Sequence, residues 1–297
     1  MQHFVMKIQT ECVPCLIKRI VFESKQSTDN EELISKTIKN SIPELAKQYD
    51  PNQCSASIAT KVHKVAYETL GDNDPYKKLK EMSNKVAKTL VPTAEKHIKN
   101  SDDPLKTSMI CSIIGNLMDF GIEGATNKPE LLLDTFEKSI EEGLGYDDYD
   151  KLKKLLSKSK RVLLFTDNCG EVVFDKILCR ELKKAYPKIN LTLVVKGEKI
   201  LSDATMEDAI DLGFDEVVDK ILTTGCFAVG LDFDKLPKEL EKALKDSDLI
   251  ICKGMANYEA FSETNYKPIA YLMRTKCNAI ATSIGVPINI SAIKVFK

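Results

Sequence analysis

Three short apolar runs in the second half of the chain are each followed directly by polar residues suited to a metal ion or a phosphate group. The runs cover residues 161–166, 190–195 and 248–252, and each has the length and composition of a buried β-strand. In an open parallel sheet, ligands bind in the crevice outside the carboxyl ends of the strands, so these three endings can meet at one point. The carboxylate, amide and ammonium groups that follow the runs suit a divalent cation and an anion held side by side.

The same half of the chain alternates such runs with amphipathic helices. This βαβ rhythm predicts a three-layer α/β/α domain with a largely parallel sheet over residues 157–297. Further strands are expected at residues 216–218 and 278–283, with an edge strand in the tail from residue 288. The helices of this domain are expected at residues 171–185, 205–212, 236–245 and 267–273.

Residues 1–156 have a helical pattern, with apolar residues spaced three or four apart. They predict an all-helical N-terminal region. The segment 105–120 carries small and apolar residues on most sides, which indicates a buried helix that ends at Gly121. Asn116 and Asp119 lie three residues apart in this segment and share one helical face. Two polar groups in an apolar helix need partners or a ligand.

Charge and hydropathy exclude several classes of protein. The 297 residues carry a formal net charge of -1 at pH 7, which argues against general nucleic-acid binding. No run approaches the length of a membrane span, and the start of the chain lacks the apolar core of a signal peptide. The sequence therefore predicts a cytoplasmic protein without a membrane partner. The nine cysteines are an odd number scattered along the chain, which argues against a disulfide framework.

Asp167 and Asn168 stand where a predicted strand turns into a helix. Asp167 would hold a cation, Asn168 would add a carbonyl oxygen, and Gly170 would let the backbone turn tightly toward a ligand. The alternative is that Asp167 or Asn168 only caps the following helix. Asp203 has a similar pair of interpretations, because either Asp203 or Thr205 can cap the helix that starts there.

A lysine followed by a glycine comes after two of the strands, as Lys196-Gly197 and as Lys253-Gly254. A lysine at a strand end is suited to clamp a phosphate group, whereas the alternative is a solvated lysine beside a turn glycine. The polar segment that begins at Asn257 favours Lys253 over Lys196 as the phosphate-binding residue.

Cys12 and Cys15 form a CxxC pair at a predicted helix start, where the helix dipole lowers the thiol pKa and favours the thiolate. This spacing is typical of redox sites and of metal sites, and the alternative is an ordinary helix start. A zinc site needs about two further ligands, and nothing in the spacing selects Cys54 and His63 for that role.

Several familiar fingerprints are missing from the sequence. It has no Walker loop, no Gly-x-Gly-x-x-Gly loop and no serine–histidine–acid order. These absences count against a P-loop kinase and against a dehydrogenase.

Taken together, the motifs resemble the DUF89 family. The resemblance rests on the segments 167–175, 202–209 and 253–259, and it extends through the CxxC pair, Asp74-Pro75-Tyr76 and the segment 115–119. It covers nearly the whole chain, and the CxxC pair and the compact length are similar to the prokaryotic and archaeal branch. The family is associated with metal-dependent damage-control phosphatases, which remove phosphate from damaged or surplus phosphometabolites, including sugar phosphates.

The resemblance implies that the helical region packs on the α/β/α domain, with a divalent metal at the junction. Asp167, Asn168 and Asp203 match the metal ligands of the family. Lys253 and Asn257 match the segment expected to contact phosphate. Asn116 and Asp119 match a polar pair that the helical region contributes to the same cleft. The expected substrate or phosphate site therefore comprises Lys253, Gly254, Asn257, Asn116, Asp119, Lys196 and Glu171.

These residues predict hydrolysis of a small phosphorylated metabolite by metal-activated water, with Asp167, Asp203 and Lys253 as the catalytic residues. Lys253 would stabilise the phosphoryl oxygens, and Asp167 or Asp203 would orient the water. A covalent aspartyl-phosphate on Asp167 is a less favoured alternative. Oxygen ligands of mixed charge fit Mg, Mn, Co or Ni.

Three other functions are consistent with the sequence. One is an S-adenosylmethionine-dependent carboxyl methyltransferase, against which the missing glycine-rich nucleotide loop counts. The second is a non-catalytic metal-binding or redox module that uses Cys12 and Cys15. The third is a binding role without chemistry, which predicts no turnover of any phosphomonoester.

Overall fold

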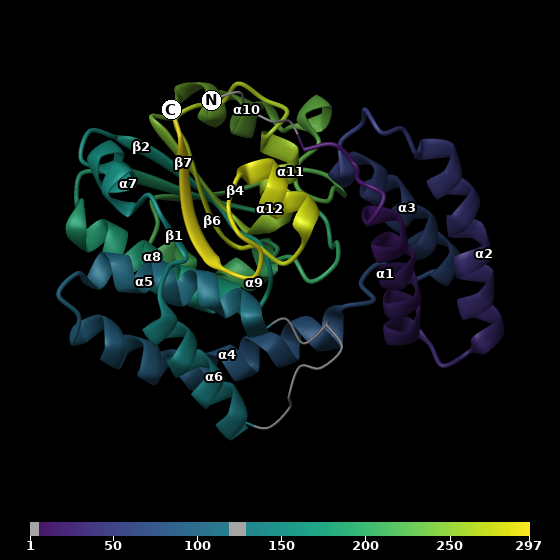
Figure 1. The fold of residues 1–297 in the computed structure, drawn as a ribbon, viewed down its shortest axis with the longest axis horizontal. Coiled ribbons are helices and arrows are strands. Elements are labelled where there is room, and N and C mark those ends of the chain that lie inside the picture. The colour runs from purple at the N-terminus through teal and green to yellow at the C-terminus, as the bar shows by residue number, and fades with distance from the viewer. Residues whose placement is uncertain (1–5, 119–128) are drawn as a thin grey trace.

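The computed structural model describes residues 6–118 and 129–297, which form a seven-stranded sheet with helices on both faces (Figure 1). The strand order is β1-β7-β6-β5-β2-β3-β4, and all neighbours are parallel except β6 and β7. In chain order the strands are β1 (Tyr146–Asp147), β2 (Arg161–Phe165), β3 (Asn190–Val195), β4 (Lys220–Thr223), β5 (Leu249–Lys253), β6 (Ile269–Arg274) and β7 (Ser291–Phe296). The predicted three-layer α/β/α fold with a largely parallel sheet is confirmed.

The central strand β2 shows why the apolar runs are continuous. Val162 and Leu164 belong to the core on one face of the sheet, and Leu163 and Phe165 belong to the core on the other face. Since successive side chains of a strand point to opposite faces, a strand covered on both sides must be apolar throughout. The first face is covered by α5 (Pro104–Ile114), α7 (Tyr149–Leu156), α8 (Glu171–Ala185) and α9 (Met206–Asp211), and the second by α10 (Lys238–Asp246), α11 (Gly254–Phe261) and α12 (Asn278–Ile284).

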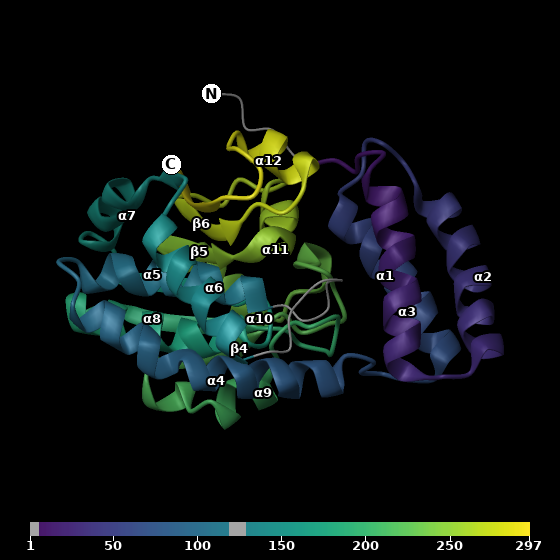
Figure 2. The same cartoon turned by 60° about the horizontal axis from the view of Figure 1, so that its bottom comes forward.

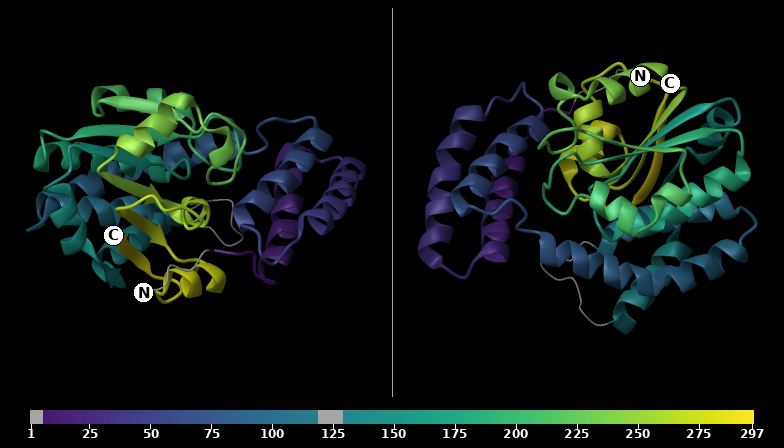
Figure 3. Two further views of the ribbon diagram at one scale, coloured as in Figure 1. Left: turned by 90° about the horizontal axis from the view of Figure 1, so that it is seen from above. Right: turned by 180° about the vertical axis from the view of Figure 1, so that it is seen from behind.

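The first three helices form a bundle that stands beside the sheet (Figures 2 and 3). They are α1 (Cys12–Ser27), α2 (Glu31–Gln48) and α3 (Ser55–Leu70). The apolar core of the bundle also contains Ile200 and Val229, which follow β3 and β4. The bundle therefore packs directly on loops at the carboxyl ends of the strands.

The next helices pack on the sheet domain itself. α4 (Lys77–Lys99) and α6 (Pro129–Glu142) share an apolar core with α5 and α8. The expectation that residues 1–156 are all helical is wrong at β1, because Tyr146 and Asp147 pair with Ala292 and Ile293 of β7. The division of the chain at residue 156 stays a prediction.

Several expected elements differ from the structure. The strand expected at residues 216–218 begins later, as β4, after a 3-10 turn at Phe214–Glu216. The helix expected at residues 267–273 is strand β6, and the strand expected at residues 278–283 is helix α12. Short apolar runs do not separate a buried strand from a buried helix by periodicity, and this ambiguity caused both errors. The tail strand β7 lies between β1 and β6, not at the edge of the sheet.

The helix expected at residues 105–120 ends at Ile114 and continues as a 3-10 turn, Gly115–Met118. A Cβ atom at Gly115 would lie 2.7 Å from the ring of Phe174, so α5 reaches α8 this closely only with glycine there. The turn brings Asn116 to the carboxyl end of β2. Asp119 and Gly121 lie outside the described residues.

In the described part of the chain, no helix is long and apolar enough to cross a membrane.

Candidate active site

The polar residues that follow the strands meet at one edge of the sheet. Asn168 pairs with Asp203 in an isolated antiparallel bridge, and Lys196 pairs with Thr205 in a parallel one. The carbonyl oxygen of Asp167 accepts a hydrogen bond from the backbone N–H of Ala204, at 2.8 Å. Asp167 and Asp203 are only 6% and 4% exposed. The structure thus brings Asp167, Asn168 and Asp203 together, as expected for residues that follow neighbouring parallel strands.

Neither Asp167 nor Asn168 caps the helix that follows them. The N-cap of α8 is Gly170, without a side-chain cap hydrogen bond, and φ is 85° there. Instead, Oδ2 of Asp167 accepts from the side-chain amides of Asn116, at 3.1 Å, and of Asn168, at 2.8 Å. The capping interpretation of these two residues is therefore wrong, and both side chains are directed to the site.

Asp203 is likewise free of a capping role. Thr205 caps α9 in a capping box with Asp208, so the helix start is satisfied without Asp203. The Asp203 carboxylate lies 3.2 Å from the ammonium of Lys196. Lys196 also donates to the carbonyl oxygen of Gly230, and the structure shows no further partner for it among the described residues. One of its three N–H bonds therefore remains for a ligand.

Lys253 is buried more deeply, at 0% exposure. Its ammonium donates to the Glu171 carboxylate, to Asp175 at 2.7 Å and to the carbonyl oxygen of Ser112 at 3.2 Å. A lysine has three N–H bonds, so protein groups occupy all of them. The Glu171 carboxylate also accepts from Asn116 at 2.6 Å, and this amide therefore links Glu171 to Asp167.

Burial dominates the electrostatics of these carboxyl groups. It raises the pKa of Asp167 well above its usual range, and the nearby carboxylates of Asp203 and Glu171 raise it further. Burial also raises the pKa of Asp203, although Lys196 opposes this shift. The pKa of Glu171 is raised to about 7, chiefly by burial, with Lys253 acting in the opposite direction. Ionisation of these buried carboxyl groups in the folded protein therefore costs free energy.

The donor chemistry of the site fits a divalent cation. Four carboxylates and two ammonium groups are buried together at the strand ends, so carboxylates outnumber ammonium groups there: Asp167, Asp203, Glu171, Asp175, Lys196 and Lys253. Lys80 and Arg19 also act to lower the pKa of Asp203. The buried Oδ1 of Asn257 is an oxygen without a hydrogen-bond partner in the structure. Oδ1 of Asn168 accepts from the hydroxyl of Ser202 at 2.6 Å and retains a second lone pair. Among the described residues, no three His, Cys, Asp or Glu side chains form a group that could hold a metal ion, so the donor set is two carboxylates with amide oxygens.

Gly254 makes the approach of α11 to this site possible. A Cβ atom there would lie 1.9 Å from Oδ2 of Asp167, and φ is 70°. Gly254→Ala is therefore expected to displace the Asp167 carboxylate. If Asp167 acts in the phosphatase reaction expected from the sequence, kcat should fall by about a hundred-fold, since small displacements of a reacting group have effects of this size. Gly285→Ala is the matched control, because its φ is 73° but nothing lies within 4 Å of its added Cβ atom. Equal loss of phosphate release in both variants would contradict this role of Gly254.

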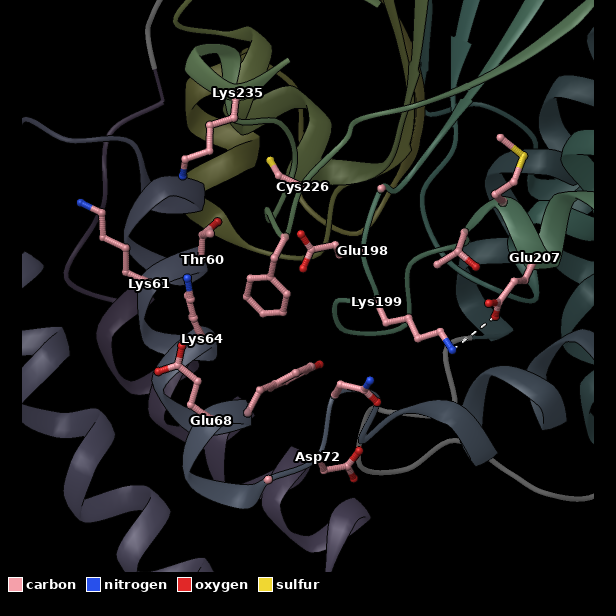
Figure 4. A pocket seen from close by; sticks show the side chains of 17 residues that line it. Thr60, Lys61, Lys64, Glu68, Asp72, Glu198, Lys199, Glu207, Cys226 and Lys235 are labelled. Carbon is pink, nitrogen blue, oxygen red and sulfur yellow. Dashed lines mark ion pairs between the residues drawn. The ribbon is translucent and has the colours of Figure 1, made fainter. Parts of the chain in front are cut away.

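A cavity of about 1070 Å³ adjoins the site, between α3 and the loops after β3 and β4 (Figure 4). Lys64 and Glu68 of α3 and Glu198 line it, and Lys199 pairs with Glu207 at 3.3 Å. Asp167 and Asp203 do not line this cavity, but Gly197 and Thr205, the neighbours of Lys196 and Ala204, do. The cavity therefore begins next to the strand-end residues Lys196 and Ala204.

Lys276 is a site residue that the sequence did not reveal. Its half-buried ammonium donates to the carbonyl oxygen of Asn116 at 2.8 Å. Lys276 lies in the loop after β6, which ends at Arg274, and Lys196 directly follows β3. If residues 269–274 had been predicted as a strand, Lys276 would have been expected at the ligand-binding edge of the sheet.

The CxxC pair has a different environment from the one expected. Burial raises the pKa of Cys12 to about 11, so the expectation of a lowered thiol pKa is wrong for Cys12. Desolvation outweighs the hydrogen bond that the sulfur accepts from the backbone N–H of Gln9, which acts to lower the pKa. The buried His63 pairs with Glu23 at 2.9 Å.

A cluster of buried carboxylates, amides and lysines at the carboxyl edge of a parallel sheet defines an α/β protein with a polar ligand site at its strand ends. Residues 8–289 match the model of the damage-control phosphatase ARMT1-like domain, and the chain belongs to this family. The resemblance to the DUF89 family is thereby confirmed.

Relatives match along their whole length. A protein of Archaeoglobus fulgidus named damage-control phosphatase is 42% identical over 292 residues, covering 98% of this chain and 100% of that protein. A damage-control phosphatase of Pyrococcus horikoshii is 29% identical over 284 residues, covering 95% and 96%. The crystal structure of a DUF89 family protein from Pyrococcus horikoshii superimposes with a TM-score of 0.89 at 28% identity, covering 98% of this chain and 100% of that one.

Proposed function

We propose that this chain is a metal-dependent phosphatase that hydrolyses small phosphorylated metabolites at the carboxyl edge of its sheet. The observation that carries the proposal is the imbalance of four buried carboxylates against two ammonium groups at the strand ends. A divalent cation suits this excess of carboxylates, and the relatives named damage-control phosphatases support the reaction class.

Asp167, Asn168 and Asp203 would hold the cation, for which Mg, Mn, Co and Ni are candidates. When bound, the cation supplies charge for the phosphoryl oxygens and lowers the pKa of water. Asn116 and Asn168 fix the orientation of the Asp167 carboxylate through its Oδ2. The carboxylate of Asp203 or Asp167 orients the attacking water.

The lysines of the site have separate roles in this proposal. Lys196 has an N–H bond left for a phosphoryl oxygen, and the half-buried Lys276 approaches the same site beside Asn116. Lys253 stabilises Glu171 and Asp175 instead of touching substrate, because its three N–H bonds are taken. This assignment reverses the preference for Lys253 that its sequence context suggested.

The proposal is tested by phosphate release from a panel of sugar phosphates, other phosphomonoesters and a chromogenic aryl phosphate. The protein is first stripped with a chelator, and then Mg²⁺, Mn²⁺, Co²⁺ or Ni²⁺ is added back. We expect release from at least one phosphomonoester that depends on added metal. Release that is unchanged by chelation, or no release with any metal, would contradict the proposal.

A further inference from the structure

The two cysteines of the CxxC pair differ in their surroundings. Cys12 is the first residue of α1, and it packs against the apolar core of the bundle and against the core that contains α11 and α12. Cys15, one turn further on, is exposed. The pair therefore joins a thiol at the contact between bundle and sheet domain with a thiol that a reagent can reach.

The helix geometry allows these two sulfur atoms to bond. Residues three apart on a helix with a rise of 1.5 Å per residue and a Cα radius of about 2.3 Å have Cα atoms about 5 Å apart. Disulfides span roughly 4.4–6.8 Å between Cα atoms. The first turn of a helix lacks the backbone hydrogen bonds of its interior, so it can adjust to the bond, and Pro14 is tolerated there.

The other thiols near α1 are less suited to partner Cys12. Glu11 accepts a hydrogen bond from the backbone N–H of Ala279, which places the start of α12 and its N-cap Cys277 beside the start of α1. Cys54 is buried, and its thiol donates to the carbonyl oxygen of Glu259 at 3.6 Å. Cys277 is thus the main competitor of Cys15, but it lies on a separate helix and lacks the fixed spacing.

We propose that Cys12 and Cys15 form a reversible dithiol–disulfide pair whose oxidant is a low-molecular-weight disulfide. The exposed Cys15 is the attacking thiol, and Cys12 is the resolving thiol. This inference does not depend on the phosphatase activity.

The exchange proceeds in two steps. The Cys15 thiolate attacks one sulfur of the small disulfide, whose S–S bond breaks and releases one thiolate. Cys12 then loses its proton to solvent and attacks the Cys15 sulfur of the mixed disulfide, which releases the second thiolate. The protein gives up two electrons and two protons, and the small disulfide is reduced to two thiols. Because Cys12 packs against both apolar cores, this closure alters the contact between the bundle and the sheet domain.

The test uses the full chain, reduced and then equilibrated with glutathione disulfide, followed by alkylation of free thiols, tryptic digestion and mass spectrometry. No lysine or arginine lies between the two cysteines, so one peptide carries both. We expect this peptide to be lighter than the dithiol form by two hydrogen atoms, and reduction to reverse the change. A persistent glutathione adduct in the wild type, a link between Cys12 and Cys277, or full alkylation of both cysteines would overturn the proposal.

Single substitutions assign the roles of the two thiols. In Cys12→Ser, the mixed disulfide on Cys15 cannot be resolved, so glutathione is expected to remain attached there. Cys15→Ser should show no disulfide at Cys12, and Cys277→Ser should form the disulfide as the wild type does. Circular dichroism checks that each variant is folded. If glutathione attached to Cys12 in the Cys15→Ser variant as fast as it attached to Cys15 in the Cys12→Ser variant, the assigned order of attack would be wrong.

Discussion

Asp167→Asn is expected to lower phosphate release by about a thousand-fold or more, since mutations that remove a single preorganised electrostatic group have effects of this order. The substitution keeps the size of the side chain but removes one of the charges that balance a divalent cation. The surface variant Asp211→Asn is the matched control, because Asp211 is exposed on α9. Undiminished metal-dependent release by Asp167→Asn would show that the carboxylate has no part in the reaction.

The same variant separates catalysis from stability. Burial holds the pKa of Asp167 above its usual range, so the folded state binds a proton more tightly than the unfolded state does. The stability contribution of this group is therefore present at low pH and is lost as the pH rises toward and through its raised pKa. At pH 8, the metal-free Asp167→Asn protein should melt at the same temperature as the metal-free wild type or at a higher one. Added divalent cation should raise the melting temperature of the wild type but not that of the variant.

Lys253→Met is expected to lower the free energy of unfolding by about 3–5 kcal/mol, the usual effect of removing one partner of a buried ion pair. The substitution leaves the fully buried carboxylates of Glu171 and Asp175 without their shared ammonium group. Urea unfolding of the metal-free protein measures the change. Lys276→Met is the control, because the ammonium of that half-buried lysine donates to a carbonyl oxygen and has no carboxylate partner among the described residues, so a smaller loss of stability is expected.

A triple variant tests the reason for this loss. Lys253→Met combined with Glu171→Gln and Asp175→Asn removes the two carboxylates together with the ammonium group, so most of the lost stability should return. If Lys253 instead acted only by touching phosphate, Lys253→Met would unfold like the wild type and lose only activity. An unchanged free energy of unfolding in the single variant would therefore reject the positioning role.

The strand endings made much of the site predictable from the sequence. Asp167, Asn168 and Asp203 follow β2 and β3, which are neighbours in the sheet, so the parallel topology alone brings them together. Lys276 was missed because β6 was taken for a helix, and a lysine after a helix carries no such expectation. The error in one element thus removed one residue from the predicted site.

The environment of Lys253 could not be predicted in the same way. Its partners Glu171 and Asp175 lie about 80 residues earlier in the chain, on α8, and Ser112 lies on α5. A lysine-glycine pair at a strand end does not indicate that a helix packed on the sheet contributes carboxylates to the lysine. The raised pKa of Cys12 has a similar origin, because burial against α11 and α12 is a property of the tertiary structure.

The most direct test of the central claim is a titration of chelator-stripped protein with Mn²⁺, in which phosphate release and bound metal are recorded on the same samples. The account predicts no release without metal, and release that rises in proportion to bound Mn²⁺ until the site formed by Asp167, Asn168 and Asp203 is filled. Metal-free protein that releases phosphate at the full rate, or release that rises equally in Asp167→Asn, would contradict it.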